Sequence, residues 1–438
     1  MIDNNSPYFN PKNETLTREQ IEALQLERLQ ATIRQCLKNE FYRKKFDELG
    51  ITPDDIQTLA DVRKLPFTTK QDLRDTYPFG MACVPLRDCV RLHSSSGTTG
   101  NPTVILHTQK DLDEWANQVA RNLWMVGLRP DDVFQNSSGY GMFTGGLGFQ
   151  YGAERLGMLT VPAAAGNSLR QIKFIKDFGT TCIHAVPSYV TRLYEVMKEQ
   201  GVDPRRDTKL KGLAIGAEPH SEEQRQRIQD MMGVKAYNSF GMSEMCGPGV
   251  GFECPEQNGL HFWEDYYIVE IVDPETLEPV PDGEIGELVL TTLCREAMPL
   301  LRYRTRDLTR VLGRTCPCGR NHIRLDRMRG RSDDMMVLRG VNIFPIQIEK
   351  VLMQFSELGN NYLITLTTDE DNDNMTVEVE LAQPTDDYKQ LQNLERDIRR
   401  RLKDEILLTP IVKLVAKGTL PVSEGKAVRV VDKRKVYQ

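Results

Sequence analysis

The 438-residue sequence lacks any run of about 18 apolar residues, so no segment of it is predicted to cross a membrane as a helix. It also lacks a strong excess of one charge, because 62 acidic and 56 basic side chains give a formal net charge of -6. A nucleic-acid-binding protein that relies on an overall basic surface is therefore excluded. Apolar residues make up 39% and charged residues 27%, which is typical of a soluble globular protein. The length predicts two or three domains.

Cysteine is scarce, and the sequence shows no secretory leader. Nine cysteines in a chain of this length are too few for a scaffold based on disulfides. The first residues, MIDNNSPYFNPKNETLTREQ, contain no basic segment followed by an apolar one. We therefore expect a cytoplasmic protein whose thiols stay reduced.

The order of helical and strand patterns predicts an α/β protein. Residues 18–50 have the apolar spacing of amphipathic helices, and Thr17 with Gln20 predicts a capping box. From about residue 110 to 235, short apolar runs alternate with amphipathic segments, which predicts mainly parallel sheets covered by helices. Residues 265–311 combine strand-forming residues with turns, which indicates a β-barrel-like section.

A change of composition after residue 333 predicts a domain boundary. We expect a large N-terminal domain over residues 1–333 and a small α+β domain over residues 334–438. The smaller domain contains a helical pattern, two strands around an acidic turn, a long charged helix and a further strand. About 100 residues is an ordinary size for a domain.

The segment SSSGTTGNPTV at residues 94–104 is the strongest local motif. Its glycines let backbone N–H groups approach an anion closely, and its hydroxyl groups add further donors. The motif therefore predicts a loop that holds a polyphosphate, although an ordinary flexible loop has a similar composition. It is not the P-loop pattern GxxxxGK[ST], because no Lys-Ser or Lys-Thr follows the second glycine.

Five further motifs follow this loop. They are GAEP (216–219), YNSFGMSE (237–244), YRTRD (303–307), RGRSDD (329–334) and SEGKAVR (423–429). In this order the chain resembles the adenylate-forming superfamily, and phenylacetate–coenzyme A ligases in particular. The resemblance implies that ATP and an arylacetic acid form an acyl-adenylate, from which coenzyme A then displaces AMP. It also implies that the C-terminal domain is mobile and rotates between the two steps.

The resemblance assigns roles to individual residues. Glu244 would coordinate Mg²⁺, Ser243 would hydrogen-bond the α-phosphate, and Lys426 would stabilise the charge that develops in adenylation. Asp333 matches the hinge between the domains. Plainer roles remain open, since Lys426 lies in a basic tail and Asp307 is of a type that often caps loops. The nucleotide-binding residues would be Ser95, Ser96, Gly97, Thr98, Thr99, Gly100, Gly216, Ala217, Glu218, Pro219, Phe240, Gly241, Met242, Asp307 and Arg331.

The segment YGMFTGG is predicted to form the acyl pocket, with Tyr140, Phe143, Gly145 and Gly146 as its residues. Aromatic side chains beside glycines form a flat slot for an aryl group, although aromatic residues also pack in ordinary cores. We expect phenylacetate, a hydroxylated form or an indole analogue as the acid. An adenylating enzyme with another acceptor, or a non-catalytic nucleotide-binding protein, is the alternative. Related ligases also suggest a homodimer.

Three cysteines and a histidine predict a structural zinc site. Cys254, His261, Cys316 and Cys318 match the sulfur and nitrogen ligands of tetrahedral zinc. The CxC spacing is less diagnostic than CxxC, and His322 competes with His261 for the fourth position. Four unrelated loop residues are the alternative.

Overall fold

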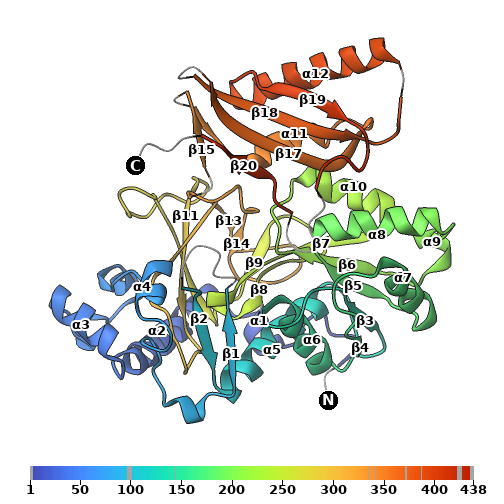
Figure 1. Ribbon diagram of the computed structural model, residues 1–438. Coiled ribbons are helices and arrows are strands. Elements are labelled where there is room, and N and C mark those ends of the chain that lie inside the picture. Colours follow the sequence, from blue (N-terminus) through green and yellow to red (C-terminus); the bar gives the residue numbers. More distant parts are fainter. Residues whose placement is uncertain are drawn as a thin grey trace.

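The computed structural model describes residues 3–95, 101–142, 144–333, 335–339, 341–369, 372–385, 387–421 and 427–434. The fold is α/β, with a large N-terminal body and a separate C-terminal unit that lies at the top in Figure 1. This confirms the fold class predicted from the sequence. Within the described ranges, every helix is too short or too polar to cross a membrane.

A nine-stranded sheet forms the centre of the body, in the order β13-β14-β9-β8-β7-β6-β5-β3-β4. The half from β4 to β7 is parallel, whereas the half from β7 to β13 is antiparallel. The direction changes after β7 because a short turn at Ser243–Met245 reverses the chain, whereas most of the parallel strands are joined through helices. The strands are β3 (Val133–Asn136), β4 (Leu159–Val161), β5 (Cys182–Ala185), β6 (Gly212–Gly216), β7 (Lys235–Met242), β8 (Gly247–Glu253), β9 (Leu260–Phe262), β13 (Val311–Gly313) and β14 (Arg324–Leu325).

Helices cover both faces of this sheet. Side chains alternate along the strands, so Ile183 and Ile215 join one hydrophobic cluster while Cys182 and Ala214 join another. Helices α7, α8 and α10 pack on the first face, and α5 and α6 pack on the second. The helices are α5 (Gln109–Met125), α6 (Thr144–Leu156), α7 (Ser168–Asp177), α8 (Pro187–Glu199), α9 (Pro204–Asp207) and α10 (Glu222–Met232).

The rest of the body consists of N-terminal helices and two small antiparallel sheets. The predicted capping box is present, since Thr17 and Gln20 exchange hydrogen bonds at the start of α2. The section expected to resemble a barrel is a three-stranded sheet, β10-β11-β12. The elements are α1 (Pro11–Glu14), α2 (Arg18–Cys36), α3 (Glu40–Leu49), α4 (Lys70–Asp75), β1 (Arg91–Ser94), β2 (Val104–His107), β10 (Tyr267–Val272), β11 (Gly286–Thr292) and β12 (Tyr303–Thr309).

The C-terminal unit has its own hydrophobic core. A four-stranded sheet, β19-β18-β17-β20, packs with α11 and α12 around buried residues such as Ile348, Ile364 and Ile398. Its elements are β15 (Met336–Leu338), β16 (Val341–Ile343), α11 (Pro345–Leu352), β17 (Leu358–Asp369), β18 (Asn372–Leu381), α12 (Tyr388–Ile406), β19 (Ile411–Val415) and β20 (Val430–Asp432). The boundary predicted after residue 333 stays a prediction.

Candidate active site

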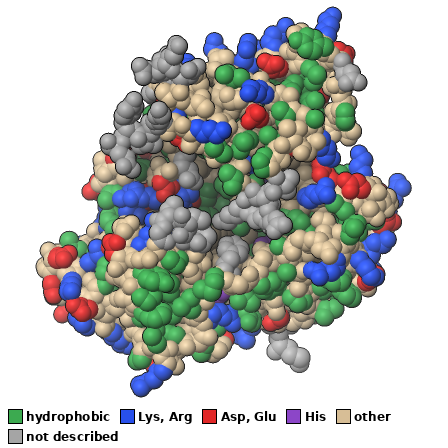
Figure 2. All heavy atoms as spheres, in the orientation of Figure 1, with side chains coloured by type: hydrophobic (Ala, Val, Ile, Leu, Met, Phe, Trp, Pro, Cys, Tyr) green, Lys and Arg blue, Asp and Glu red, His purple; other side chains and the backbone are tan. Residues whose placement is uncertain are grey.

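A large cleft opens between the body and the C-terminal unit, where the surface in Figure 2 is hollowed. The cleft has a volume of about 2330 Å³, which exceeds the roughly 300–1000 Å³ of an ordinary small-molecule site. Parallel strands β5, β6 and β7 end at the cleft, as expected for a ligand site in a sheet of this kind. The volume therefore allows more than one substrate to bind.

Most of the described residues that the sequence predicts for the nucleotide meet in this cleft. They come from positions more than 200 residues apart, so only the fold brings them together. The predicted residues in the lining are Ser95, Gly145, Gly216, Ala217, Glu218, Pro219, Phe240, Gly241, Met242, Ser243, Glu244, Asp307, Arg331 and Asp333. Ser96–Gly100, Phe143 and Lys426 lie outside the described residues.

Two motif glycines are required by close backbone contacts. A Cβ atom on Gly216 of the GAEP motif would lie 2.2 Å from the carbonyl oxygen of Ser239 on the neighbouring strand. A Cβ atom on Gly241 would lie 2.1 Å from the carbonyl oxygen of Gly247. Ala217 has a φ of 65°, a conformation that costs energy for a residue with a side chain. These glycines let the ends of β6 and β7 pack closely beside the cleft.

Glu244 is buried at the start of the turn after β7, with its carboxylate close to the phosphate loop. The hydroxyl of Thr103 lies 3.5 Å from Glu244 Oε1, and Arg295 donates to the backbone oxygen of Glu244 at 2.6 Å. Ser243 Oγ lies 3.4 Å from Thr144 Oγ1 at the start of α6. A carboxylate held beside hydroxyl groups has the chemistry that a hard cation such as Mg²⁺ prefers. The surroundings of Glu244 therefore fit its predicted role as a magnesium ligand.

Asp307 lies on β12, on the wall of the cleft formed by the body. Burial raises the pKa of Asp307 to about 7, although Arg331, 3.7 Å away, acts in the opposite direction. Arg331 donates to both carboxylate oxygens of Asp333 at 2.8 Å. Asp307 and Arg331, two predicted nucleotide-binding residues, therefore form one cluster with Asp333, the predicted hinge residue.

Glu218 joins the body to the segment that contains the predicted catalytic lysine. Its carboxylate accepts from the backbone N–H and the hydroxyl of Ser188, at 3.0 and 2.8 Å. It also accepts from the backbone N–H of Ala427 at 2.8 Å. Ala427 follows Lys426 directly, so the SEGKA segment ends at the cleft.

Of the described residues predicted for the acyl pocket, only some line the cleft. Gly145 lines the cleft, but Tyr140 and Gly146 are absent from the lining formed by the described residues. Asn136 Nδ2 donates to the hydroxyl of Tyr140 at 3.0 Å and to the carbonyl oxygen of Gly146 at 2.6 Å. The structure adds Phe149 and His184 to the lining, which sequence analysis missed. His184 lies in the apolar run TCIHAV. A polar residue inside this run was the only sign in the sequence that the position has a function.

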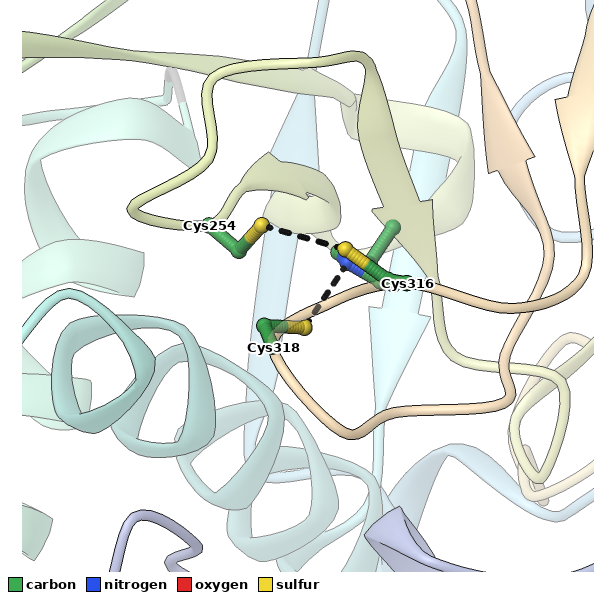
Figure 3. Close-up of side chains that lie close together, drawn as sticks. Cys254, Cys316 and Cys318 are labelled. Atoms are coloured by element: carbon green, nitrogen blue, oxygen red, sulfur yellow. Dashed lines mark hydrogen bonds between the residues drawn. The ribbon is translucent and has the colours of Figure 1, made fainter.

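The four predicted zinc ligands come together away from the cleft. Their ligand atoms all lie within 4.8 Å of one another, and Figure 3 shows the three cysteine side chains pointing toward a common centre. Cys254 Sγ is 3.7 Å from Cys316 Sγ, and Cys318 Sγ is 3.4 Å from His261 Nε2. Tetrahedral Zn–S bonds of about 2.3 Å place neighbouring ligand atoms roughly 3.8 Å apart. The cluster therefore fits zinc.

His322 is not the fourth member of this cluster. Its Nδ1 accepts from the backbone N–H of Glu264 at 3.0 Å, and its Nε2 donates to the carbonyl oxygen of Asn13 at 2.8 Å. Both ring nitrogens are thus used elsewhere, and His261 is the histidine beside the thiols.

Family profiles match both parts of the chain. The AMP-binding enzyme profile matches residues 23–294, and the profile of the AMP-binding enzyme C-terminal domain matches residues 340–434. The phenylacetate-coenzyme A ligase of Thermus thermophilus is 43% identical over 98% of this chain and 100% of its own length. The phenylacetate-coenzyme A ligase of Escherichia coli is 44% identical over 97% of each chain.

Two solved structures of one relative superpose on this chain to different extents. A 2-hydroxyisobutyryl-CoA ligase in the postadenylation state is 30% identical and superposes with a TM-score of 0.92, covering 99% of this chain and 95% of that chain. The same enzyme in the thioesterification state covers the same shares, but its TM-score is 0.72. The arrangement of this chain therefore resembles the first of these states.

The fold, the cleft and the profiles define an AMP-binding enzyme of the adenylate-forming class. Within this class, the chain belongs to the phenylacetate–coenzyme A ligase family, a family of acid–thiol ligases.

Proposed function

We propose that this protein ligates an arylacetic acid, phenylacetate or a close analogue, to coenzyme A through an acyl-adenylate. ATP is consumed, and AMP and pyrophosphate are released. The observation that carries the proposal is the meeting in one cleft of predicted nucleotide residues that lie up to 236 positions apart in the sequence, from Ser95 to Arg331. Membership of the ligase family supports the choice of acid and acceptor.

Adenylation requires positioning and charge stabilisation more than proton transfer. The carboxylate of the acid is already ionised at pH 7 and attacks the α-phosphate without a general base. Ser243, which lines the cleft, would hydrogen-bond that phosphate, and Glu244 would hold the Mg²⁺ that neutralises the phosphate oxygens. Asp307 would accept hydrogen bonds from the ribose hydroxyls. The body thus binds the nucleotide and the acid.

Lys426 would act from the C-terminal unit, where its ammonium group stabilises the charge of the α-phosphate in the transition state. The hydrogen bond from the next residue, Ala427, to Glu218 supports this position. Rotation of the unit at Asp333 would then remove Lys426 and admit coenzyme A. The higher TM-score with the postadenylation state supports an arrangement that belongs to the first half-reaction.

A structural zinc ion is a further part of the proposal. Cys254, His261, Cys316 and Cys318 would supply a complete tetrahedral set, which suits a structural role better than a catalytic one. The cytoplasmic location and the homodimer remain predictions from the sequence.

The direct test is a two-product assay. Purified protein is mixed with ATP, Mg²⁺, coenzyme A and phenylacetate or its ring-substituted analogues, and AMP and thioester are measured. We expect equal amounts of both products, with loss of both in the Glu244→Gln variant. AMP without thioester would indicate another acceptor, and no AMP with any acid would contradict an enzymatic function.

A further inference from the structure

His184 on β5 is a buried side chain that faces the cleft on the acyl side. Its residue is 3% exposed, and its ring stacks on the ring of Phe149 with centroids 3.8 Å apart. Both residues line the cleft together with Gly145. The adenylation mechanism given above does not use this imidazole.

The protonation of His184 follows from its neighbours. The carbonyl oxygen of Gly146 can only accept a hydrogen bond, so the group of Asn136 that lies 2.6 Å from it is the amide Nδ2. The other atom of that amide, Oδ1, therefore faces His184 Nδ1 at 2.9 Å and accepts from it. The proton of the ring is thus on Nδ1.

Burial also lowers the pKa of His184 to about 3, so the ring is neutral at physiological pH. A neutral imidazole with its proton on Nδ1 has a lone pair on Nε2. No hydrogen bond joins this Nε2 to any other residue that the structure describes. This Nε2 is not among the fully buried polar atoms without a partner, so it reaches the cleft that His184 lines. An aryl acid that covers it excludes water from it, so an acid that supplies a hydrogen-bond donor is favoured over one that does not.

We propose that His184 Nε2 accepts a hydrogen bond from the ring of the acid, so that the preferred substrate is an arylacetic acid with a ring hydroxyl group. The inference rests on the proposed function, because it names the substrate class of the same reaction. Phe149 and Gly145 provide the slot for the aromatic ring, and the lone pair of His184 selects its substituent. An indole N–H would satisfy the same acceptor.

The test compares kcat/KM of the wild-type protein for phenylacetate and for the 2-, 3- and 4-hydroxyphenylacetates. The matching methyl and methoxy compounds are the controls, since the methoxy group keeps the oxygen but has no proton to donate. Indole-3-acetate and its N-methyl derivative form a second pair. We expect at least one donor compound to exceed its matched control by about tenfold or more.

Two variants assign the effect to His184. His184→Phe keeps a ring that stacks on Phe149 but removes the acceptor, so the preference for the hydroxyl compound should fall below about twofold while phenylacetate is still used. His184→Gln offers an amide oxygen and should recover part of the preference. A wild-type protein that shows no such preference overturns the proposal even if a variant fails to fold.

The outcomes separate this inference from the proposed function. If phenylacetate is converted and no donor compound exceeds its methyl or methoxy control, the role of His184 is wrong and the proposed function stands. A preference that survives in His184→Phe also contradicts the inference. If no aryl acid is adenylated, the proposed function itself fails and the inference with it.

Discussion

The interior of the N-terminal body and its boundary with the C-terminal unit are held together in different ways. One hydrophobic cluster in the body contains buried residues from Leu29 to Leu325. The C-terminal unit has a separate cluster that begins at Met336. No buried apolar cluster of the described residues includes members of both parts.

The boundary itself is mainly polar. Ser221 donates to Glu349 at 2.7 Å, and Arg227 donates to the side chain of Asn360 at 3.0 Å and to the carbonyl oxygen of Leu358 at 3.2 Å. Water can replace each of these bonds when the units separate, whereas an exposed hydrophobic core has no such replacement. The body is therefore built to stay folded, whereas the contacts at its boundary with the C-terminal unit can be exchanged for water.

Loss of the thiol cluster should have the largest effect, and it should affect only the body. We expect Cys316→Ala to lose its zinc and to lower the unfolding temperature of the body clearly, because zinc ligation contributes several kcal/mol or more to folding. The C-terminal unit, which has its own core, should unfold as in the wild type. Metal analysis and calorimetry measure the two effects.

Cys89→Ala is the matched control, since Cys89 is half-buried and lies outside the cluster. It should keep both the zinc and the unfolding temperature. Wild-type protein without zinc would show that the four ligand atoms meet for another reason.

Lys426→Ala should separate the two half-reactions. Adenylation should fall by about 10²–10³-fold, because a group that stabilises transition-state charge is removed. Thioester formation from added acyl-adenylate should change little. Pyrophosphate release and thioester formation are measured separately, with Lys433→Ala as a control in the same basic tail. An equal loss in both half-reactions would contradict the role given to Lys426.

Asp307 should make nucleotide binding depend on pH. Its pKa is raised to about 7 by burial, so the carboxylate that accepts from the ribose is present above pH 7 and is lost as the pH falls. The KM for ATP should therefore rise by nearly tenfold per pH unit below 7.

The Asp307→Asn variant provides the control for this titration. ATP itself takes up a proton near this pH, but it does so with both proteins, so the difference between the two profiles reports on Asp307. Parallel profiles would show that the carboxylate does not contact the nucleotide.

A change at the boundary should have the smallest effect. Glu349→Ala removes a carboxylate that accepts from Ser221 in the body and from the hydroxyl of Tyr362 in its own unit, at 2.7 and 2.9 Å. Adenylation should fall by about threefold to tenfold, while the stability of the body stays unchanged. Glu357→Ala, an exposed position on the same unit, should leave both unchanged. A large fall in stability would show that the boundary belongs to the folded core.

The sequence predicted the features that depend on nearby residues. The capping box at Thr17 and the helical segment over residues 18–50 both follow from local chemistry. The antiparallel half of the main sheet was not predicted, because alternation of side chains gives the faces of a strand but not the direction of its neighbour.

The candidate site, too, could be predicted from the sequence only in part. Motifs identified the residues around the nucleotide, but the choice between His261 and His322 required their positions in space. His184 was missed for the same reason, since one histidine in an apolar strand carries no local sign that its neighbour Asn136 fixes its proton.

The most direct test of the exchangeable boundary is a distance measurement between fluorophores on Gln226 of α10 and Arg399 of α12, both exposed. The protein is measured with ATP and Mg²⁺, and then with the acyl-adenylate and coenzyme A. We expect one distance under the first condition and a clearly different distance under the second, while the fold of the body stays unchanged. A single distance under both conditions would contradict this expectation.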